Sequence, residues 1–275
     1  RPTSPCARTG CGTWRGWSTA ARVFWHRLRR ERLTYLVLML WIAVAALIAL
    51  AAATLSTAHW AGLLTALVGM AAGGSVIWIV RIIGAVVLAA GGSTRMGRPK
   101  QLLVRQGETL LRRAARLARE GVDGPVVVVL GAAAETVGRE LHGLDIVPSR
   151  HAGWREGMGS SLAAGVGKLS QLAPNLSGAL LLLIDQPLIA LPYPASLVAH
   201  FRSTDVDLAA TRYGREEGSA VGPPAVFASH LFPRLMVLSG DQGARSLLND
   251  RSLRRTFLTH EPAAIDWDTP EDLLQ

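Results

Sequence analysis

A run of apolar residues followed directly by a glycine-rich basic loop constrains the fold more than any other feature of this chain. Residues 82–87 read IIGAVV, and residues 88–103 read LAAGGSTRMGRPKQLL. The β-branched and aliphatic run is typical of a strand buried on both faces of a parallel sheet. Gly91 and Gly92 let the backbone turn sharply after this strand, and backbone N–H groups gathered in such a turn bind anions.

Three basic side chains, Arg95, Arg98 and Lys100, give this loop positive charges that suit phosphate oxygens. A surface turn with solvated basic residues is the alternative interpretation. The loop has neither the GxxxxGK[ST] spacing of a Walker loop nor the GxGxxG spacing of a dinucleotide-binding turn. The sequence therefore predicts a phosphate-binding loop of another kind.

Apolar runs and segments of helical periodicity alternate over residues 82–275. The predicted strands cover residues 82–87, 125–130, 144–148, 178–187 and 207–213. The predicted helices cover residues 109–120, 132–141, 157–169, 193–201, 229–238 and 243–249. Residues 214–228, which contain two adjacent prolines, are predicted to form an irregular hairpin. The alternation predicts a three-layer, Rossmann-like α/β domain with a mostly parallel sheet, whose ligands bind at the carboxyl ends of the strands.

The residues before this domain have a different character. Residues 1–32 form a basic segment for which the sequence predicts no fold. Residues 33–55 and 60–80 contain no charged side chain, and each stretch can cross a bilayer core of about 30 Å at roughly 1.5 Å per residue. Arginines flank both outer ends, which predicts a transmembrane helical hairpin over residues 33–80 with both ends in the cytoplasm.

This hairpin predicts a membrane-tethered protein with a cytoplasmic catalytic domain. A signal peptide and a buried hairpin of a soluble domain are alternatives. If residues 1–81 are not part of the mature protein, we expect it to be cytoplasmic. Residues 1–81 hold nine arginines and one acidic residue, whereas residues 82–275 hold 20 basic and 19 acidic residues. The near-neutral domain gives no indication of a nucleic-acid partner.

Acidic side chains occur where a parallel sheet would gather its ligands. Asp185 closes the predicted strand GALLLLID, so its carboxylate should face the crevice at the strand ends; a turn cap is the alternative. The closing segment IDWDTPEDLL, residues 265–274, supplies Asp266 and Asp268. Mg²⁺ typically binds one or two such carboxylates and leaves its other positions to phosphate and water.

Small residues precede a third predicted helix in the segment HAGWREGMGSS, residues 151–161. Gly157, Ser160 and Ser161 offer backbone and hydroxyl donors at the start of that helix. A helix N-terminus with such donors is a reasonable site for a phosphate or a base.

Taken in this order, the motifs resemble those of the MobA-like nucleotidyltransferases. Residues 88–103 match the family string LAAGxSxRMGxxKxLL at every specified position, and residues 185–187 match its DQP motif. Residues 265–274 resemble its closing DTPEDL motif. Residues 151–161 resemble its NxxWxxGMxSSL string, with His151 where asparagine is usual. Residues 222–227 with 239–248 resemble its acceptor-side segments; nothing before Arg81 has a counterpart.

The resemblance implies a nucleotidyltransferase in which Arg95, Lys100 and Asp185 are catalytic. It implies a Mg²⁺ ion on Asp185 and Asp268, with Asp266 as the competing ligand. The implied nucleotide contacts are Leu88, Ala89, Ala90, Gly91, Gly92, Ser93, Arg95, Lys100, Gly157, Ser160 and Ser161.

The resemblance also favours a subfamily, because molybdenum cofactor cytidylyltransferases carry LAAG and DQP whereas the guanylyltransferases carry LAGG. It implies transfer of CMP from CTP to molybdopterin, with a molybdoenzyme among the partners. A guanylyltransferase, or a transferase for another phosphorylated acceptor, is the alternative within this class. A membrane-tethered protein that binds a nucleotide or cofactor with little turnover is the alternative from another class.

Overall fold

The structure is a computed structural model that describes residue 43 and residues 81–93, 96–216 and 218–274 of the chain. The chain divides into two compact units, residues 1–79 and residues 80–275. The predicted basic segment and nearly all of the predicted hairpin over residues 33–80 lie outside the described residues. Within the described ranges, no helix combines the length and the apolar character that crossing a membrane requires.

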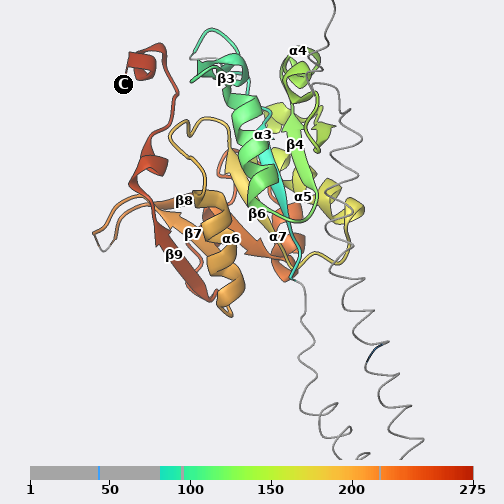
Figure 1. Ribbon diagram of the computed structural model, residues 1–275, viewed down its shortest axis with the longest axis vertical. Helices are drawn as coiled ribbons and strands as arrows, with labels where there is room; N and C mark the ends of the chain where they lie inside the picture. The colour runs from blue at the N-terminus through green and yellow to red at the C-terminus, as the bar shows by residue number, and fades with distance from the viewer. Residues whose placement is uncertain (1–42, 44–80, 94–95, 217, 275) are drawn as a thin grey trace, which may run out of the picture. The chain divides into compact units, whose positions relative to one another are not determined.

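A seven-stranded sheet with the order β5-β4-β1-β6-β8-β7-β9 forms the centre of the second unit (Figure 1). Its strands are β1 (Ile83–Ala89), β4 (Val126–Leu130), β5 (Val147–Arg150), β6 (Gly178–Leu183), β7 (Leu208–Arg212), β8 (Val221–Ala228) and β9 (Arg255–Thr259). Every pair is parallel except those of β8, which runs antiparallel to both β6 and β7. The prediction of a mostly parallel sheet is confirmed.

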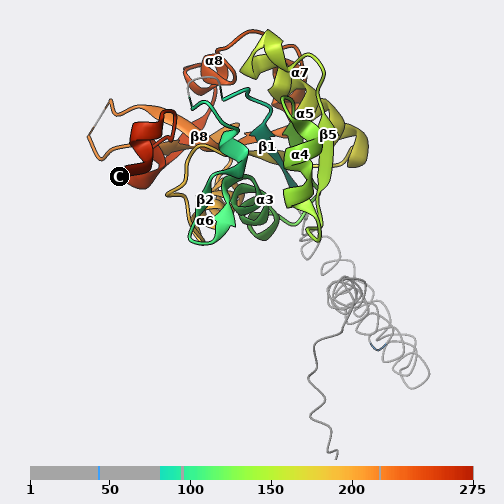
Figure 2. The same ribbon diagram turned by 90° about the horizontal axis from the view of Figure 1, so that it is seen from above.

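Helices cover both faces of this sheet (Figures 1 and 2). One face carries α3 (Leu110–Gly121), α4 (Ala134–Gly138) and α6 (Tyr193–Ser203), and the other carries α5 (Met158–Leu172), α7 (Phe232–Met236) and α8 (Arg245–Leu248). The side chains of β1 alternate between the two cores: Ala85 and Val87 pack with α3 and α6, and Val86 and Leu88 with α5. The domain is therefore a three-layer α/β structure, as predicted.

Helix α3 shows how local sequence fixes one element. The hydroxyl of Thr109 accepts the N–H of Arg112, which caps the first turn. Leu111, Ala115 and Ala118 form one fully buried stripe against the sheet. The predicted helix over residues 109–120 is confirmed.

The prediction of an irregular hairpin over residues 214–228 is wrong, because residues 221–228 form strand β8 inside the sheet. The pairing of β7 and β8 shifts register between Ala210 and Thr211, and Pro223 and Pro224 lie in this irregularity. Proline has no backbone N–H to donate to a neighbouring strand. Residues in a bulge are not paired with that strand, so proline is tolerated there. The carbonyls of both prolines accept side-chain bonds instead.

Four further strands differ from the prediction. The third strand was expected at residues 144–148, and β5 lies at Val147–Arg150. Strand β9 was not predicted, because RTFLT at a sheet edge has only two apolar residues. The short strands β2 (Val104–Arg105) and β3 (Glu108–Thr109) form a separate two-stranded sheet and were also not predicted.

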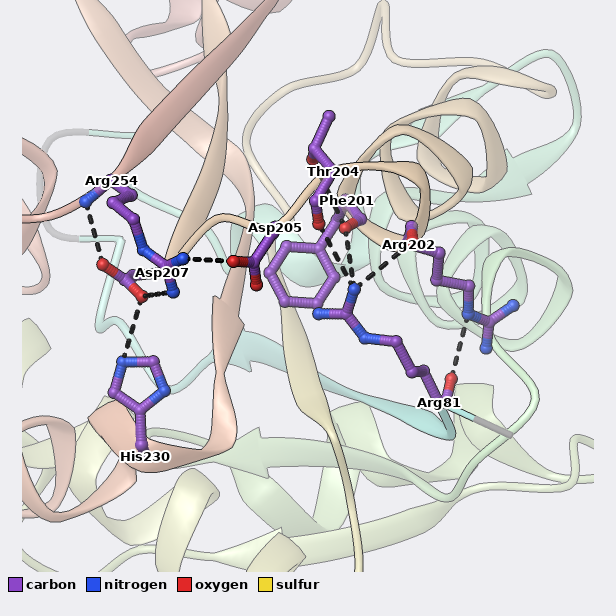
Figure 3. Close-up of polar contacts among 8 residues, drawn as sticks. All are labelled: Arg81, Phe201, Arg202, Thr204, Asp205, Asp207, His230 and Arg254. Carbon is purple, nitrogen blue, oxygen red and sulfur yellow. Dashed lines mark hydrogen bonds and ion pairs between the residues drawn. The ribbon is translucent and has the colours of Figure 1, made fainter. Parts of the chain in front are cut away.

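Charged residues join β7 and β9 at the amino ends of the strands (Figure 3). The carboxylate of Asp207 accepts the N–H of Arg254 at 2.8 Å and its guanidinium at 2.9 Å. His230 Nε2 lies 3.4 Å from the same carboxylate. The bonds from Arg254 hold the pKa of Asp207 below its usual range.

Arg81, just before β1, holds the start of the domain against the end of α6 (Figure 3). Its guanidinium donates to the carbonyls of Phe201, Arg202 and Thr204, where α6 ends. It also lies 4.7 Å from the centre of the Phe201 ring. A cation at this end complements the unpaired carbonyls and the dipole of the helix.

We expect Asp207→Asn to lower the free energy of unfolding at pH 7 by about 1–2 kcal/mol, because it weakens charge-assisted bonds at a buried position. The folded-state pKa of Asp207 lies below its unfolded value, so its contribution is present above the unfolded pKa and is lost as the pH falls through the folded pKa. The difference between variant and wild type should therefore shrink between pH 7 and pH 3 in denaturant titrations.

Asp205→Asn is the matched control for this prediction. Asp205 also pairs with Arg254, but its side chain is 92% exposed. Exposed ion pairs contribute little, so we expect a change below about 0.5 kcal/mol. Equal effects of the two substitutions at pH 7 would contradict the structural role of Asp207.

Candidate functional site

The loop after β1 lies at the carboxyl end of a strand that pairs with β4 on one side and β6 on the other. The buried Gln101 supports it from inside, because its Nε2 donates to the carbonyls of Ala89 at 2.8 Å and Gly91 at 2.9 Å. Ser93 has a positive φ of 51°. Its hydroxyl accepts the N–H of Lys100 at 2.9 Å, which closes the loop.

A cavity of about 280 Å³ adjoins this loop. It is lined by Gly91, Gly92, Ser93, Gly97, Arg98, Pro99, Gln101, Ala132 and Ala133. Its size is near the lower end of the range for small-molecule sites, about 300–1,000 Å³. The predicted residues Gly91, Gly92 and Ser93 therefore face a space that a ligand can enter.

Other predicted contacts are buried or lie outside the described part of the chain. Leu88, Ala89 and Ala90 are buried. The carbonyls of Ala89 and Ala90 accept bonds from Gln101 and from the N–H of Ala132. Arg95 falls among the residues that the structure does not describe, so its catalytic role stays a prediction.

The closing segment reaches the carboxyl edge of the sheet through Trp267. The N–H of Trp267 donates to the carbonyl of Asp185 at 2.8 Å. Its buried ring packs with Met96 and Leu103 of the loop after β1 and with Leu110, the first residue of α3. A single tryptophan thus joins the end of the chain to both the loop and the residues after β6.

Three carboxylates meet beside this tryptophan. Asp185 lies two residues beyond the end of β6. Asp266 and Asp268 flank Trp267, and both keep contact with solvent while the tryptophan is buried. Lys100 forms an ion pair with Asp268, 168 residues away in the sequence. The structure therefore brings together Lys100, Asp185 and both candidates for the second metal ligand.

The electrostatics of this cluster show an excess of negative charge. Burial raises the pKa of Asp185; Lys100 opposes the increase and Asp268 adds to it. Partial desolvation, followed by the charges of Asp185 and Asp268, raises the pKa of Asp266 to about 7. Asp185 Oδ1 is buried and has no hydrogen-bond partner among the described residues. A buried acceptor of this kind is costly unless a cation or donor satisfies it.

These residues fit a divalent cation. Within the described ranges, no three His, Cys, Asp or Glu side chains form a ready-made metal site. Mg²⁺ does not require one, because it commonly binds one or two carboxylates and completes its shell with phosphate and water. The unsatisfied oxygen of Asp185, with Asp266 or Asp268 beside it, matches that requirement. Asp268, which pairs with Lys100, stays the predicted second ligand, and Asp266 stays the competing one.

The predicted contacts at the start of α5 lie elsewhere. Ser160 and Ser161 are buried, and their hydroxyls donate to the carbonyl of Gly157 at 2.9 and 3.4 Å. His151 Nε2 lies 3.1 Å from the Ser160 hydroxyl. None of these residues lines the cavity at the loop. Their assignment to the nucleotide stays a prediction.

Gly157 has a packing reason for being glycine. Its φ is 110°, and a Cβ at this position would lie 2.3 Å from the backbone of Gly240. The N–H of Gly159 donates to the carbonyl of Gly240 at 2.8 Å. Both glycines let the acceptor-side segment of residues 239–248 lie directly against the start of α5.

The sequence interpretation missed three residues that hold the site together, namely Gln101, Gln186 and Trp267. The two glutamines directly follow the predicted site residues Lys100 and Asp185, and both are buried. The signal available in the sequence was a glutamine directly after a predicted site residue. Its partners could not be identified from the sequence, because they come from distant parts of the chain.

Residues 85–256 match the MobA-like NTP transferase domain model, which spans well over half of the chain. The chain belongs to the MobA-like NTP transferase family. This confirms the family that the motifs indicated. The loop after β1 and Asp185 both lie within the matched range, whereas Asp266 and Asp268 follow it.

Proteins similar to this chain carry different names. Nicotine blue oxidoreductase of Paenarthrobacter nicotinovorans is 35% identical over 197 residues, 68% of this chain and 93% of that protein. Purine catabolism protein PucB of Bacillus subtilis is 30% identical over 202 residues, 68% and 92% of the two chains. Molybdenum cofactor guanylyltransferase of Rhizobium meliloti is 33% identical over 119 residues, 43% and 51% of the two chains.

Solved structures of similar proteins show the same fold. Rv0371c from Mycobacterium tuberculosis is 29% identical with a TM-score of 0.58, covering 70% of this chain and 96% of that chain. A structure of Rv0371c in complex with manganese is 28% identical with a TM-score of 0.56 and the same coverage. A divalent metal therefore binds to at least one similar protein.

We expect Asp266→Asn to stabilise the metal-free protein at pH 8. The folded-state pKa of about 7 lies above the ordinary value near 3.9, so the wild type loses stability as the pH rises from about 4 to about 7. Asparagine carries no charge that partial desolvation or the neighbouring carboxylates Asp185 and Asp268 could destabilise, so the variant should lack this loss. Thermal unfolding in EDTA should give a higher midpoint for the variant at pH 8 and nearly equal midpoints at pH 4. If the unfolding midpoints of the variant and the wild type change in parallel with pH, the three carboxylates do not repel one another as proposed.

Proposed function

We propose that this domain transfers a nucleotidyl group from a nucleoside triphosphate to a phosphorylated acceptor, and that CTP and a molybdopterin-type acceptor are its substrates. The observation that carries the proposal is the meeting of Lys100, from the phosphate-binding loop, with Asp268, from the closing segment, beside the buried Asp185. Cationic and carboxylate groups gathered at the carboxyl ends of neighbouring strands suit the binding of a triphosphate together with a metal ion.

The reaction requires positioning and charge neutralisation more than a protein nucleophile. A phosphate oxygen of the acceptor attacks the α-phosphorus, a new P–O bond forms, and the bond to the β-phosphate oxygen breaks. Pyrophosphate leaves with that bonding electron pair. Lys100, together with Arg95, would stabilise the charge on the departing pyrophosphate. Exposed backbone groups at Gly91 and Gly92 would hold the phosphates in line.

Asp185 and Asp268, with Asp266 as the competing ligand, would hold Mg²⁺ or Mn²⁺. When bound, such an ion neutralises phosphate charge and polarises the phosphoryl oxygens. The support for this part is the unpaired Asp185 Oδ1 and the manganese complex of a similar protein.

Two sequence features favour CTP. Ala90 stands where the guanylyltransferases have glycine, and Gln186 completes the DQP string. GTP is the alternative nucleotide, because one similar protein is named a molybdenum cofactor guanylyltransferase. The membrane tether over residues 33–80 and a molybdoenzyme partner remain proposals that rest on the sequence.

A redox reaction is the second candidate, because a protein 35% identical to this chain is named an oxidoreductase. A loop that binds a triphosphate can also bind the pyrophosphate of a dinucleotide. The two candidates differ in their products. Nucleotidyl transfer releases pyrophosphate, whereas the alternative would consume a reduced dinucleotide.

Purified protein should release pyrophosphate when it is mixed with molybdopterin, Mg²⁺ or Mn²⁺ and one of the four common nucleoside triphosphates. We expect CTP to give the highest rate and EDTA to stop the reaction. A parallel mixture with NADPH and no triphosphate tests the second candidate. Oxidation of NADPH, with no pyrophosphate from any triphosphate, would overturn the proposed function.

Two substitutions test the assigned residues in the same assay. We expect Lys100→Ala to lower turnover at least tenfold, which corresponds to a loss of about 1.4 kcal/mol of transition-state stabilisation. Asp185→Asn keeps the side-chain shape but removes the charge, and it should abolish turnover. Thermal midpoints within a few degrees of wild type would show that both variants fold. Wild-type turnover in either variant would refute its assignment.

A further inference from the structure

Two buried glutamines each stand directly beside a residue of the proposed site. Gln101 follows Lys100 and is 1% exposed; Gln186 follows Asp185 and is 5% exposed. A buried carboxamide is costly unless its polar atoms are bonded. Both amide nitrogens and the Gln101 oxygen make such bonds, whereas Gln186 Oε1 is buried without a partner among the described residues. The partners of these bonds show what each side chain orders.

All partners of Gln101 belong to the phosphate-binding loop. Its Nε2 donates to the carbonyls of Ala89 and Gly91, and its Oε1 accepts the hydroxyl of Ser93 at 3.5 Å. Ser93 in turn accepts the N–H of Lys100. The carboxamide thus joins the first and last residues of a loop whose outer face lines the cavity.

The partners of Gln186 come from three other segments. Its Nε2 donates to the carbonyls of Pro223 at 2.9 Å and Ala263 at 2.7 Å, and to the hydroxyl of Tyr213 at 3.3 Å. The Tyr213 hydroxyl donates to the same Pro223 carbonyl at 2.7 Å. Gln186 therefore joins the end of β6 to the start of β8 and to the segment that follows β9.

The bond to Ala263 sets where the closing segment lies. Ala263 precedes Asp266 by three residues, and Trp267 bonds to the Asp185 carbonyl on the other side of Asp266. Two adjacent residues, 185 and 186, thus hold the closing segment at two points. The carboxylates of Asp266 and Asp268 come beside Asp185 because of these two bonds.

We propose that Gln101 and Gln186 are positioning residues with separate tasks: Gln101 orders the phosphate-binding loop for the nucleotide, and Gln186 orders the three carboxylates for the divalent cation. The inference rests on the proposed function. The two side chains share no hydrogen-bond partner within the described residues. Sites without shared partners usually act independently, so each substitution should affect one ligand only.

Gln101→Met and Gln186→Met test this separation, because methionine has a similar length but cannot donate to a carbonyl. CTP and GTP binding are measured in EDTA, and Mn²⁺ binding to the nucleotide-free protein is followed by the EPR signal of free Mn²⁺. We expect Gln101→Met to weaken binding of the preferred nucleotide about tenfold and to leave Mn²⁺ binding within about twofold. Gln186→Met should do the reverse, so each variant is the control for the other.

If a methionine variant does not fold, two milder variants test the same separation of tasks. Ser93→Ala removes one partner of Gln101, and Tyr213→Phe removes one partner of Gln186. Each should shift the same affinity as its glutamine variant, by a smaller factor.

Folded variants that change both affinities equally, or that change neither, would overturn the separate tasks. If the wild type binds neither nucleotide, the proposed function fails, while the Mn²⁺ titrations still test Gln186.

Discussion

Negative charge crowded at the carboxyl end of β6 is the constraint on which the site depends. Asp185 is held there with one buried oxygen unpaired, and Asp266 has a pKa of about 7 because of partial desolvation and two neighbouring carboxylates. Lys100 is paired with Asp268 and supplies one compensating charge. The arrangement is unfavourable without a further cation, and a site that binds a metal ion with a triphosphate requires that property.

The fold maintains this crowding with apolar contacts on both faces of the sheet. Strand β1 contributes alternate side chains to the two cores, and β6 beside it is almost entirely buried. Trp267 then holds the closing segment in a small cluster of its own. The stability of the two cores thus offsets the electrostatic cost at their edge, and the loop after β1 and the carboxylates after β6 lie beside each other because their strands are paired.

Local patterns were sufficient to predict much of this structure. The strand of residues 82–87 and the helix capped by Thr109 were predicted because their signals lie within a few residues. Strand β8 was missed because its two prolines are acceptable only in the register shift opposite β7, a property of two strands together. Strand β9 was missed because its edge position allows a mixed sequence. Its place in the sheet comes from the parallel pairing with β7.

The site was predicted in part for the same reason. Lys100, Asp185 and Asp268 stood in motifs, whereas Gln186 and Trp267 act through partners that are tens of residues away. At Gly157 the motif indicated a phosphate contact, whereas the structure shows a second reason for glycine at this position. The backbone of Gly240 packs too closely against it for any side chain to fit. Asp268 stays the predicted second ligand and Asp266 the competing one, since both flank the same buried tryptophan.

The central claim is that Asp185 and Asp268 hold one divalent cation together with the nucleotide. Mn²⁺ affinity in the presence of saturating CTP, measured by EPR for wild type, Asp185→Asn, Asp268→Asn and the double variant, tests it most directly. We predict that each single substitution weakens Mn²⁺ binding at least tenfold, and that the double variant is scarcely weaker than the worse single one, because both act on one ion. Losses that simply add, or Mn²⁺ affinity unchanged by either substitution, would contradict a shared metal site.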